Sequence, residues 1–246
     1  MNDPSTDRPT GTITVAAIGD LHVREDSERS YRALFEEISE VADVLALAGD
    51  LTDFGKTGEA EKLAEDLRAC TIPAVGVLGN HDFESGQPEK VAEILRQAGV
   101  KLLDDQATVI DGVGFAGVKG FLGGFDRGEL GAFGEDAVKV FVDEAMNEAR
   151  KLENQLRTLR TERVMAVLHY APIADTVEGE PLQIYPFLGS SRLADAVDRF
   201  DNVKAVVHGH AHRGRYEGRT PAGAPVYNVA YHIEKPSGRP YALIEV

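Results

Sequence analysis

Five apolar, strand-like runs of this chain each end in glycine, carboxylate, amide or imidazole groups. The runs read TVAAIG, DVLALAG, PAVGVLG, VMAVLH and VKAVVHG. At or just after their ends stand the clusters Asp20-Leu-His22, Gly49-Asp50, Gly79-Asn80-His81-Asp82, His169 and His208-Gly-His210-Ala-His212. Open α/β sheets place their sites just outside the carboxyl ends of the strands. The pattern therefore predicts that these side chains meet at one edge of a sheet.

Helical and strand-like spacing alternate along the chain. Strands are predicted at 12–18, 43–48, 72–78, 100–103, 107–110, 113–118, 164–168 and 203–207, with β-rich segments at 213–217, 226–229 and 241–246. Helices are predicted at 30–41, 58–70, 88–98, 135–160 and 193–199. This rhythm favours βαβ units and a largely parallel core. The Asp111-Gly112 turn predicts a hairpin between two of the short strands.

Three segments stand apart from this alternation. Residues 1–11 are polar and are expected to be a disordered leader, and residues 12–246 are expected to form one domain. Gly120–Gly134 carries six glycines and three phenylalanines, which is typical of a flexible loop. The apolar residues of the long helix at 135–160 repeat at coiled-coil spacing. Small alanines fill two of these positions, so we expect this face to cover a sheet instead.

The composition limits the class of partner. Lys and Arg number 26 against 41 Asp and Glu, a formal net charge of −15. Such a surface repels phosphate backbones, which argues against a nucleic-acid polymer as partner and suits a small anionic substrate better. A lone cysteine, Cys70, and no apolar run near the ~20 residues of a membrane span predict a cytoplasmic protein without membrane attachment. The sequence leaves a homo-oligomer open.

The strand-end residues are of the types that bind metal ions. Without thiolates, imidazole nitrogens and carboxylate or amide oxygens bind divalent first-row metals. Asp20 and His22, if still extended, point the same way and can converge on one ion. His210 and His212 repeat this spacing, which predicts two adjacent metals.

The five clusters, in this order, resemble the pattern of the calcineurin-like metallophosphoesterases: D-x-H, GD, GNH[DE], H and GHxH. The resemblance covers nearly the whole chain. It implies an α/β fold, a four-layer α/β/β/α sandwich with two mixed β-sheets face to face and helices outside. It also implies that a first metal is held by Asp20, His22, Asp50 and His212. Asp50 would bridge to a second metal, completed by Asn80, His169 and His210.

The same resemblance implies the chemistry. Two divalent ions, Mn or Fe by preference with Zn, Ni or Co open, would supply a bridging hydroxide for in-line attack on a phosphoester. His81 is expected to assist the leaving group. Asp53 matches the second aspartate of the family's GDxxD and is expected to orient His81, although a helix N-cap or turn role is a close alternative. Asp82 is expected to cap its turn, and neither His208 nor His232 is assigned a chemical role.

Departures from the best-known branch bear on the substrate. Protein phosphatases of the family read GDxxDRG and GNHE, whereas this chain reads GDLTDFG and GNHD, with Phe54 in place of the arginine. We therefore expect a small phosphodiester or nucleotide-like substrate. A phosphomonoesterase, a non-catalytic scaffold and a chelating protein are the alternatives. Loops 120–134 and 175–191 are expected to select the substrate. Candidate phosphate contacts are Arg24, Arg127, Arg192 and Arg213.

Overall fold

The computed structural model describes residues 12–104 and 106–246. The predicted leader, residues 1–11, lies outside this part of the chain. Among the described residues, no helix combines the length and apolar character that crossing a membrane requires.

The first sheet is built from the ends of the chain and its first βαβ units. Its strands run in the order β11-β1-β2-β3-β4. Their bounds are Ala242–Glu245 (β11), Thr14–Ile18 (β1), Val44–Ala48 (β2), Ala74–Val77 (β3) and Val100–Leu102 (β4). β1 to β4 are parallel, while β11 pairs antiparallel with β1, with Thr14 opposite Glu245.

The second sheet is also mixed. Its strand order is β5-β6-β7-β8-β10-β9. The strands are Thr108–Ile110 (β5), Val113–Val118 (β6), Arg163–Leu168 (β7), Val203–His208 (β8), Pro225–Asn228 (β10) and Glu217–Arg219 (β9). The antiparallel pair β5–β6 confirms the predicted hairpin at Asp111-Gly112. The β-rich segment predicted at 213–217 is displaced, because the chain turns after His212 and pairs with β10 only from Glu217.

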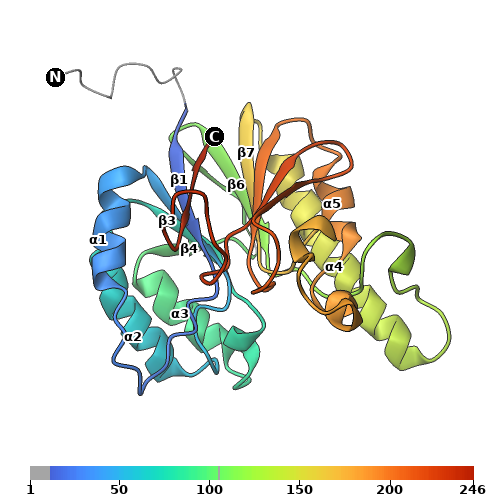
Figure 1. Cartoon of the computed structure of the whole chain (residues 1–246), viewed down its shortest axis with the longest axis horizontal. Helices are drawn as coiled ribbons and strands as arrows, with labels where there is room; N and C mark the ends of the chain where they lie inside the picture. The colour runs from blue at the N-terminus through green and yellow to red at the C-terminus, as the bar shows by residue number, and fades with distance from the viewer. Residues whose placement is uncertain (1–11, 105) are drawn as a thin grey trace.

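The two sheets and their helices form four layers (Figure 1). On one outer side lie α1 (Arg32–Val41), α2 (Thr57–Leu67) and α3 (Pro88–Gln97), and on the other α4 (Asp136–Thr158) and α5 (Ser191–Val197). Three buried apolar clusters fill the spaces between the layers, one between the facing sheets and one beneath each helical layer. This confirms the predicted sandwich of two mixed sheets with helices outside.

Burial explains why the strands read as continuous apolar runs. Every residue of β1, β2 and β3 is buried, as expected for parallel strands covered on both faces. The long helix α4 turns Val142, Ala145 and Leu152 inward, onto β6 and α5. The predicted sheet-covering face is therefore confirmed, and the coiled-coil alternative is wrong.

Candidate metal centre

The carboxyl ends of β1, β2, β3, β7 and β8 bring the predicted ligands together, with each strand followed by one of the five clusters. Three groups of side chains form there, each with ligand atoms within 4.8 Å of one another. One of them joins His22 to the two predicted catalytic residues, His81 and Asp53, and the other two contain only predicted metal ligands. Of these two, the first contains Asp20, His22 and His212, and the second contains Asp50, His169 and His210. The i and i+2 histidines, His210 and His212, thus serve different groups.

The first group depends on one short contact between the two sheets. The Nε2 atom of His212 lies 2.9 Å from Oδ1 of Asp20. The backbone N–H of His210 donates to both oxygens of the same carboxylate, at 2.9 and 3.0 Å. The ring of His22 lies 5.3 Å from that of His212. Asp20 therefore holds the turn after β8 against the turn after β1.

The second group is more deeply buried. The Nε2 atom of His169 lies 2.9 Å from Oδ1 of Asn80 and 3.3 Å from Oδ1 of Asp50. The other carboxylate oxygen of Asp50 lies 3.9 Å from Nε2 of His22, in the first group. Asp50 thus lies between the groups, where the family resemblance requires a bridging ligand.

The backbone reaches these positions by left-handed turns. Asp20, His22, Asp50 and His210 all have positive φ, at 58°, 45°, 48° and 69°. Such angles are uncommon for residues other than glycine and mark constrained functional sites. The expectation that Asp20 and His22 converge from an extended strand is therefore wrong. The two side chains meet because the chain curls at each of them.

Two glycines allow the turns to approach the carboxylates. A Cβ on Gly79 would lie 2.2 Å from the backbone nitrogen and Oδ1 of Asp50. A Cβ on Gly209 would lie 2.3 Å from Oδ2 of Asp20. Any side chain at either position would push a predicted ligand away, so the glycines in GNHD and HGHAH are required by packing.

Asp82 fastens two of the turns to each other. Its carboxylate is fully buried and accepts hydrogen bonds from the N–H groups of Gly79, Leu51 and Thr52 and from the Thr52 hydroxyl. The predicted turn cap is present in the bond to Gly79. The further bonds connect the turn after β3 to the turn after β2, so Asp82 also fixes Asp50 relative to Asn80.

The hydrogen bonds of the histidines show which ring nitrogens face the centre. His169 donates from Nδ1 to the Ala48 carbonyl, at 3.0 Å, which leaves its Nε2 as an acceptor pointing at two oxygens. His22 contacts Asp53 through Nδ1, at 3.1 Å. Its buried Nε2 has no hydrogen-bond partner among the described residues. Two imidazole Nε2 atoms thus face the centre with no donor opposite them among the described residues, and this suits divalent metal ions.

Burial also sets the charge state of the centre. Burial, with the charges of Asp20 and Asp82, raises the pKa of Asp50 to about 9. Burial works to raise the pKa of Asp20 as well, but the hydrogen bond with His212 and the nearby histidines bring it to about 2. Burial lowers the pKa values of His22, His169 and His210. These imidazoles are therefore neutral, the form that binds metals.

The structure places His81 beside the first group and brings Asp53 close to both His81 and His22. The ring of His81 lies 4.5 Å from that of His22, and its side chain is 40% exposed. Its Nδ1 donates to the backbone carbonyl of Asp53, at 2.7 Å, whereas the Asp53 carboxylate lies 3.9 Å away and contacts His22 instead. The side-chain pairing predicted for Asp53 with His81 is thus present only as this longer contact, and its role in catalysis stays a prediction. The carboxylate orients His22.

The predicted phosphate contacts differ in their surroundings. Arg24 lies at the edge of the centre, 3.8 Å from Oδ2 of Asp53. Arg213 follows His212, and its backbone N–H binds Glu180. Arg192 is held by Glu129, at 3.1 Å. Arg127 lies on a turn at Asp126–Gly128, and no hydrogen bond or ion pair within the described ranges connects it to the centre.

Two residues near the centre had no assigned role in the sequence. The ring of His232 lies 5.9 Å from that of His212. Lys119 directly follows β6, and its carbonyl accepts the N–H of His169. Lys119 follows the apolar run VGFAGV, just as the predicted ligands follow their runs, and the same reasoning applied to this run would have found it. Lys119 was not considered because it lies between the strand predicted at 113–118 and the loop predicted at 120–134.

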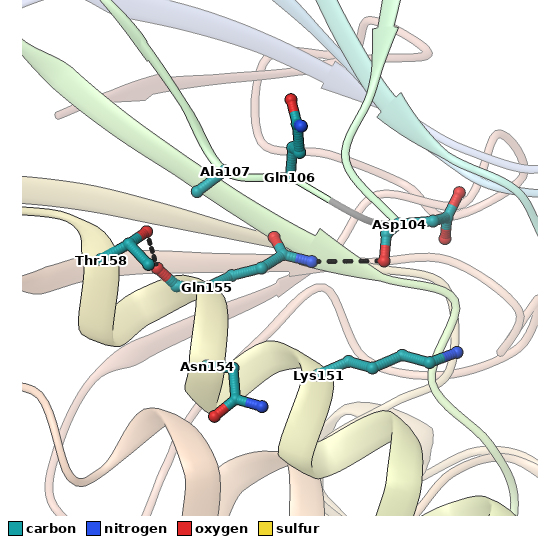
Figure 2. Close-up of a pocket in the computed structure, with 7 residues that line it drawn as sticks. All are labelled: Asp104, Gln106, Ala107, Lys151, Asn154, Gln155 and Thr158. Carbon is teal, nitrogen blue, oxygen red and sulfur yellow. Dashed lines mark hydrogen bonds between the residues drawn. The ribbon is translucent and has the colours of Figure 1, made fainter.

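A separate pocket of about 400 Å³ lies between α4 and the segment after β4. Figure 2 shows Gln155 in its wall, reaching the backbone of Asp104. Gln155 also binds the backbone N–H and carbonyl of Gly117, so it fastens α4 to β6. None of the predicted site residues lines this pocket.

The sequence profile of the family described as calcineurin-like phosphoesterase matches residues 13–214. A probable glycerophosphodiester phosphodiesterase of Arcobacter nitrofigilis is 23% identical over 82% of this chain and 72% of its own length. A probable cyclic nucleotide phosphodiesterase of Synechococcus sp. is 32% identical, but the match spans 34% of this chain and 35% of that protein.

Solved structures support the fold. Phosphopantetheinyl hydrolase from Mycobacterium tuberculosis has a TM-score of 0.67 at 16% identity, covering 96% of this chain and 97% of its own. A protein of Thermus thermophilus has a TM-score of 0.58 at 18% identity, covering 96% and 98%. The chain therefore belongs to the calcineurin-like phosphoesterase family, a family of metal-dependent phosphoric ester hydrolases, as its five motifs predict.

Proposed function

We propose that this protein is a dinuclear metal-dependent phosphodiesterase that acts on a small phosphodiester or nucleotide-like substrate. The observation that carries the proposal is the position of Asp50 between two groups of ligand side chains, close to His22 of one and His169 of the other. Asp20, His22, Asp50 and His212 would hold one ion, and Asp50, Asn80, His169 and His210 the other. Mn or Fe suits this donor set.

When bound, two divalent ions polarise a phosphoryl oxygen and lower the pKa of water enough to supply a nucleophile at neutral pH. The protein's own residues orient the ligand histidines and protonate the leaving group. In the doubly protonated form of His81, the Nδ1–H is held by the Asp53 carbonyl, so the Nε2–H is the proton left to pass to the leaving oxygen. The partial exposure of His81 lets a leaving group reach this atom.

The proposal of a diester substrate rests on the relatives named as phosphodiesterases. It also rests on Phe54, which stands where protein phosphatases of the family have an arginine. Turnover of bis-(p-nitrophenyl) phosphate and p-nitrophenyl phosphate by metal-loaded protein separates the possibilities. We expect a preference for the diester. A strong preference for the monoester would instead establish a phosphomonoesterase.

The variant His81→Asn tests the catalytic part of the proposal. We expect kcat to fall about 10²–10⁴-fold, the usual contribution of a positioned acid or base, while metal content measured by mass spectrometry stays unchanged. Full activity of this variant would remove His81 from the mechanism. No turnover by the metal-loaded wild-type protein on either ester would favour the non-catalytic scaffold.

A further inference from the structure

Lys119 begins at the same sheet edge as the predicted ligands. It directly follows β6, the neighbour of β7 in the second sheet. Its backbone carbonyl accepts the N–H groups of His169 and Tyr170, at 3.2 and 3.0 Å. The side chain therefore starts next to the strand end that carries a predicted ligand.

Three aromatic rings surround the ammonium group of Lys119. Its Nζ lies 5.4 Å from the centroid of Phe83, 5.0 Å from Phe121 and 5.4 Å from Tyr170. Phe83 stands two residues after His81. The ring of Tyr170 also lies 4.6 Å from that of His210 and 5.3 Å from that of His169. A single aromatic ring thus separates the ammonium from the second ligand group.

The charge of this ammonium is not neutralised by a direct contact. Within residues 12–104 and 106–246, no carboxylate oxygen lies within 4.0 Å of Nζ, and its hydrogen bond goes to the Gly120 carbonyl, at 2.8 Å. Three carboxylates, of Glu148, Glu144 and Asp104, act on it from farther away, and Glu148 is paired with Lys151, at 2.6 Å. Burial lowers the pKa of Lys119. An ammonium has three donors, and among the described residues Nζ makes one hydrogen bond, to Gly120.

We propose that Lys119 determines specificity by binding a second anionic group of the substrate, a carboxylate or phosphate on the leaving-group side. Tyr170 separates Nζ from the ligand histidines, so Lys119 contacts a part of the substrate next to the scissile phosphate. Phe83 connects it to the turn of His81, where the leaving group is expected. This inference rests on the proposed phosphodiesterase function, and it selects phosphodiesters that carry an additional negative charge.

A pair of esters that differ in one charge tests the inference. Methyl 4-carboxyphenyl phosphate carries a second anion, and methyl 4-carbamoylphenyl phosphate replaces it with a neutral amide of similar shape. In metal-loaded full-length protein, we expect Lys119→Met to raise the KM of the carboxylate ester about tenfold, the effect of losing one charged hydrogen bond. Its kcat and the KM of the amide ester should change less than twofold.

Further variants separate specificity from a structural role. Lys119→Arg should keep most of the preference for the carboxylate ester. Lys90→Met removes an equal charge from the exposed face of α3 and should leave both KM values unchanged. If Lys119→Met does not fold, as judged by thermal unfolding, Lys119→Gln takes its place, because it keeps a donor for Gly120.

The outcomes distinguish the two proposals. Equal KM increases for both esters, or no change for either, would overturn the specificity role while leaving the phosphodiesterase intact. Failure of the metal-loaded wild-type protein to hydrolyse either ester would instead remove the proposed function, and the role of Lys119 with it.

Discussion

The turns of the metal centre and the outer loops, 120–134 and 175–191, are built in opposite ways. The turns bury their charged side chains, with Asp20 and Asp50 each 1% exposed, and hold four predicted ligands at positive φ. The outer loops leave Phe133 89% and Leu182 73% exposed. The centre is fixed by many contacts, while the outer loops present surface.

The two regions are nevertheless connected. The outer loops pair with each other through backbone bonds from Gly123 to Pro186 and from Gly124 to Gly189. The predicted ligand His210 contacts the Phe187 carbonyl through Nε2, at 3.1 Å. The glycine-rich loop 120–134 is therefore held by backbone hydrogen bonds on the side that faces loop 175–191. Changes in the turns should affect the chemistry, and changes in the outer loops should affect the choice of substrate.

The largest effect is expected from Asp50→Asn, which removes the carboxylate between the ligand groups. Metal content should fall by at least one ion per chain, with activity reduced beyond the ~10⁴-fold range of a lost acid or base. Metal analysis and single-turnover assays measure both. Retention of two ions in this variant would show that Asp50 does not bridge.

The same variant should also change how the stability of the metal-free protein depends on pH. The pKa of Asp50 rises from 3.8 to about 9 on folding, so the folded state binds more protons than the unfolded chain between these values. Stability of the metal-free wild type should therefore fall as pH rises through this window. The stability of the metal-free Asp50→Asn variant should fall less over the same pH range, as measured by thermal unfolding at several pH values. Parallel curves would contradict the raised pKa.

A smaller effect is expected from Asp53→Ala. The carboxylate orients His22, while the bond to His81 comes from the backbone carbonyl and survives the change. We expect metal affinity to weaken about 10–100-fold, as for other residues that orient a metal-binding histidine. At saturating metal, kcat should change only a few-fold. A large fall in kcat with unchanged metal affinity would show instead that the Asp53 carboxylate acts through His81, as the family resemblance implies.

Two glycine substitutions compare the regions directly. Gly79→Ala places a Cβ 2.2 Å from Asp50 and should cost about 1–3 kcal/mol of unfolding free energy, the usual cost of overpacking. In the outer loops, a Cβ on Gly131 meets nothing within 4 Å. Gly131→Ala should therefore stay within about 0.5 kcal/mol of the wild type. Equal losses of unfolding free energy for the two variants, measured in urea, would contradict the difference in packing between the two regions.

The smallest effect is expected from Phe133→Ser. This side chain is 89% exposed, so unfolding free energy should change by less than about 0.5 kcal/mol. Turnover of bis-(p-nitrophenyl) phosphate should also stay unchanged. Reduced turnover of so small an ester would mean that the outer loops act on the reaction itself.

The sequence predicted the fold well because buried parallel strands must be apolar, and these runs were long enough to read. It also predicted which side chains meet, since parallel strands bring their carboxyl ends to one edge. It failed on Asp20 and His22, whose left-handed backbone no residue pattern announces. It did not predict that the Asp53 carboxylate also contacts His22, or that the Asp53 carbonyl accepts the hydrogen bond of His81, because both depend on how the turn after β2 is packed.

The sequence by itself determined the family and the set of residues at the sheet edge, since the chemical motifs stand in a fixed order after apolar runs. The four layers were implied by the resemblance to that family. Only the tertiary structure decided that the Asp53 carboxylate contacts His22 and that Lys119 lies among three rings. Such contacts join residues from different strands, turns and sheets. Their distances depend on how the layers pack, and no local stretch of sequence contains that information.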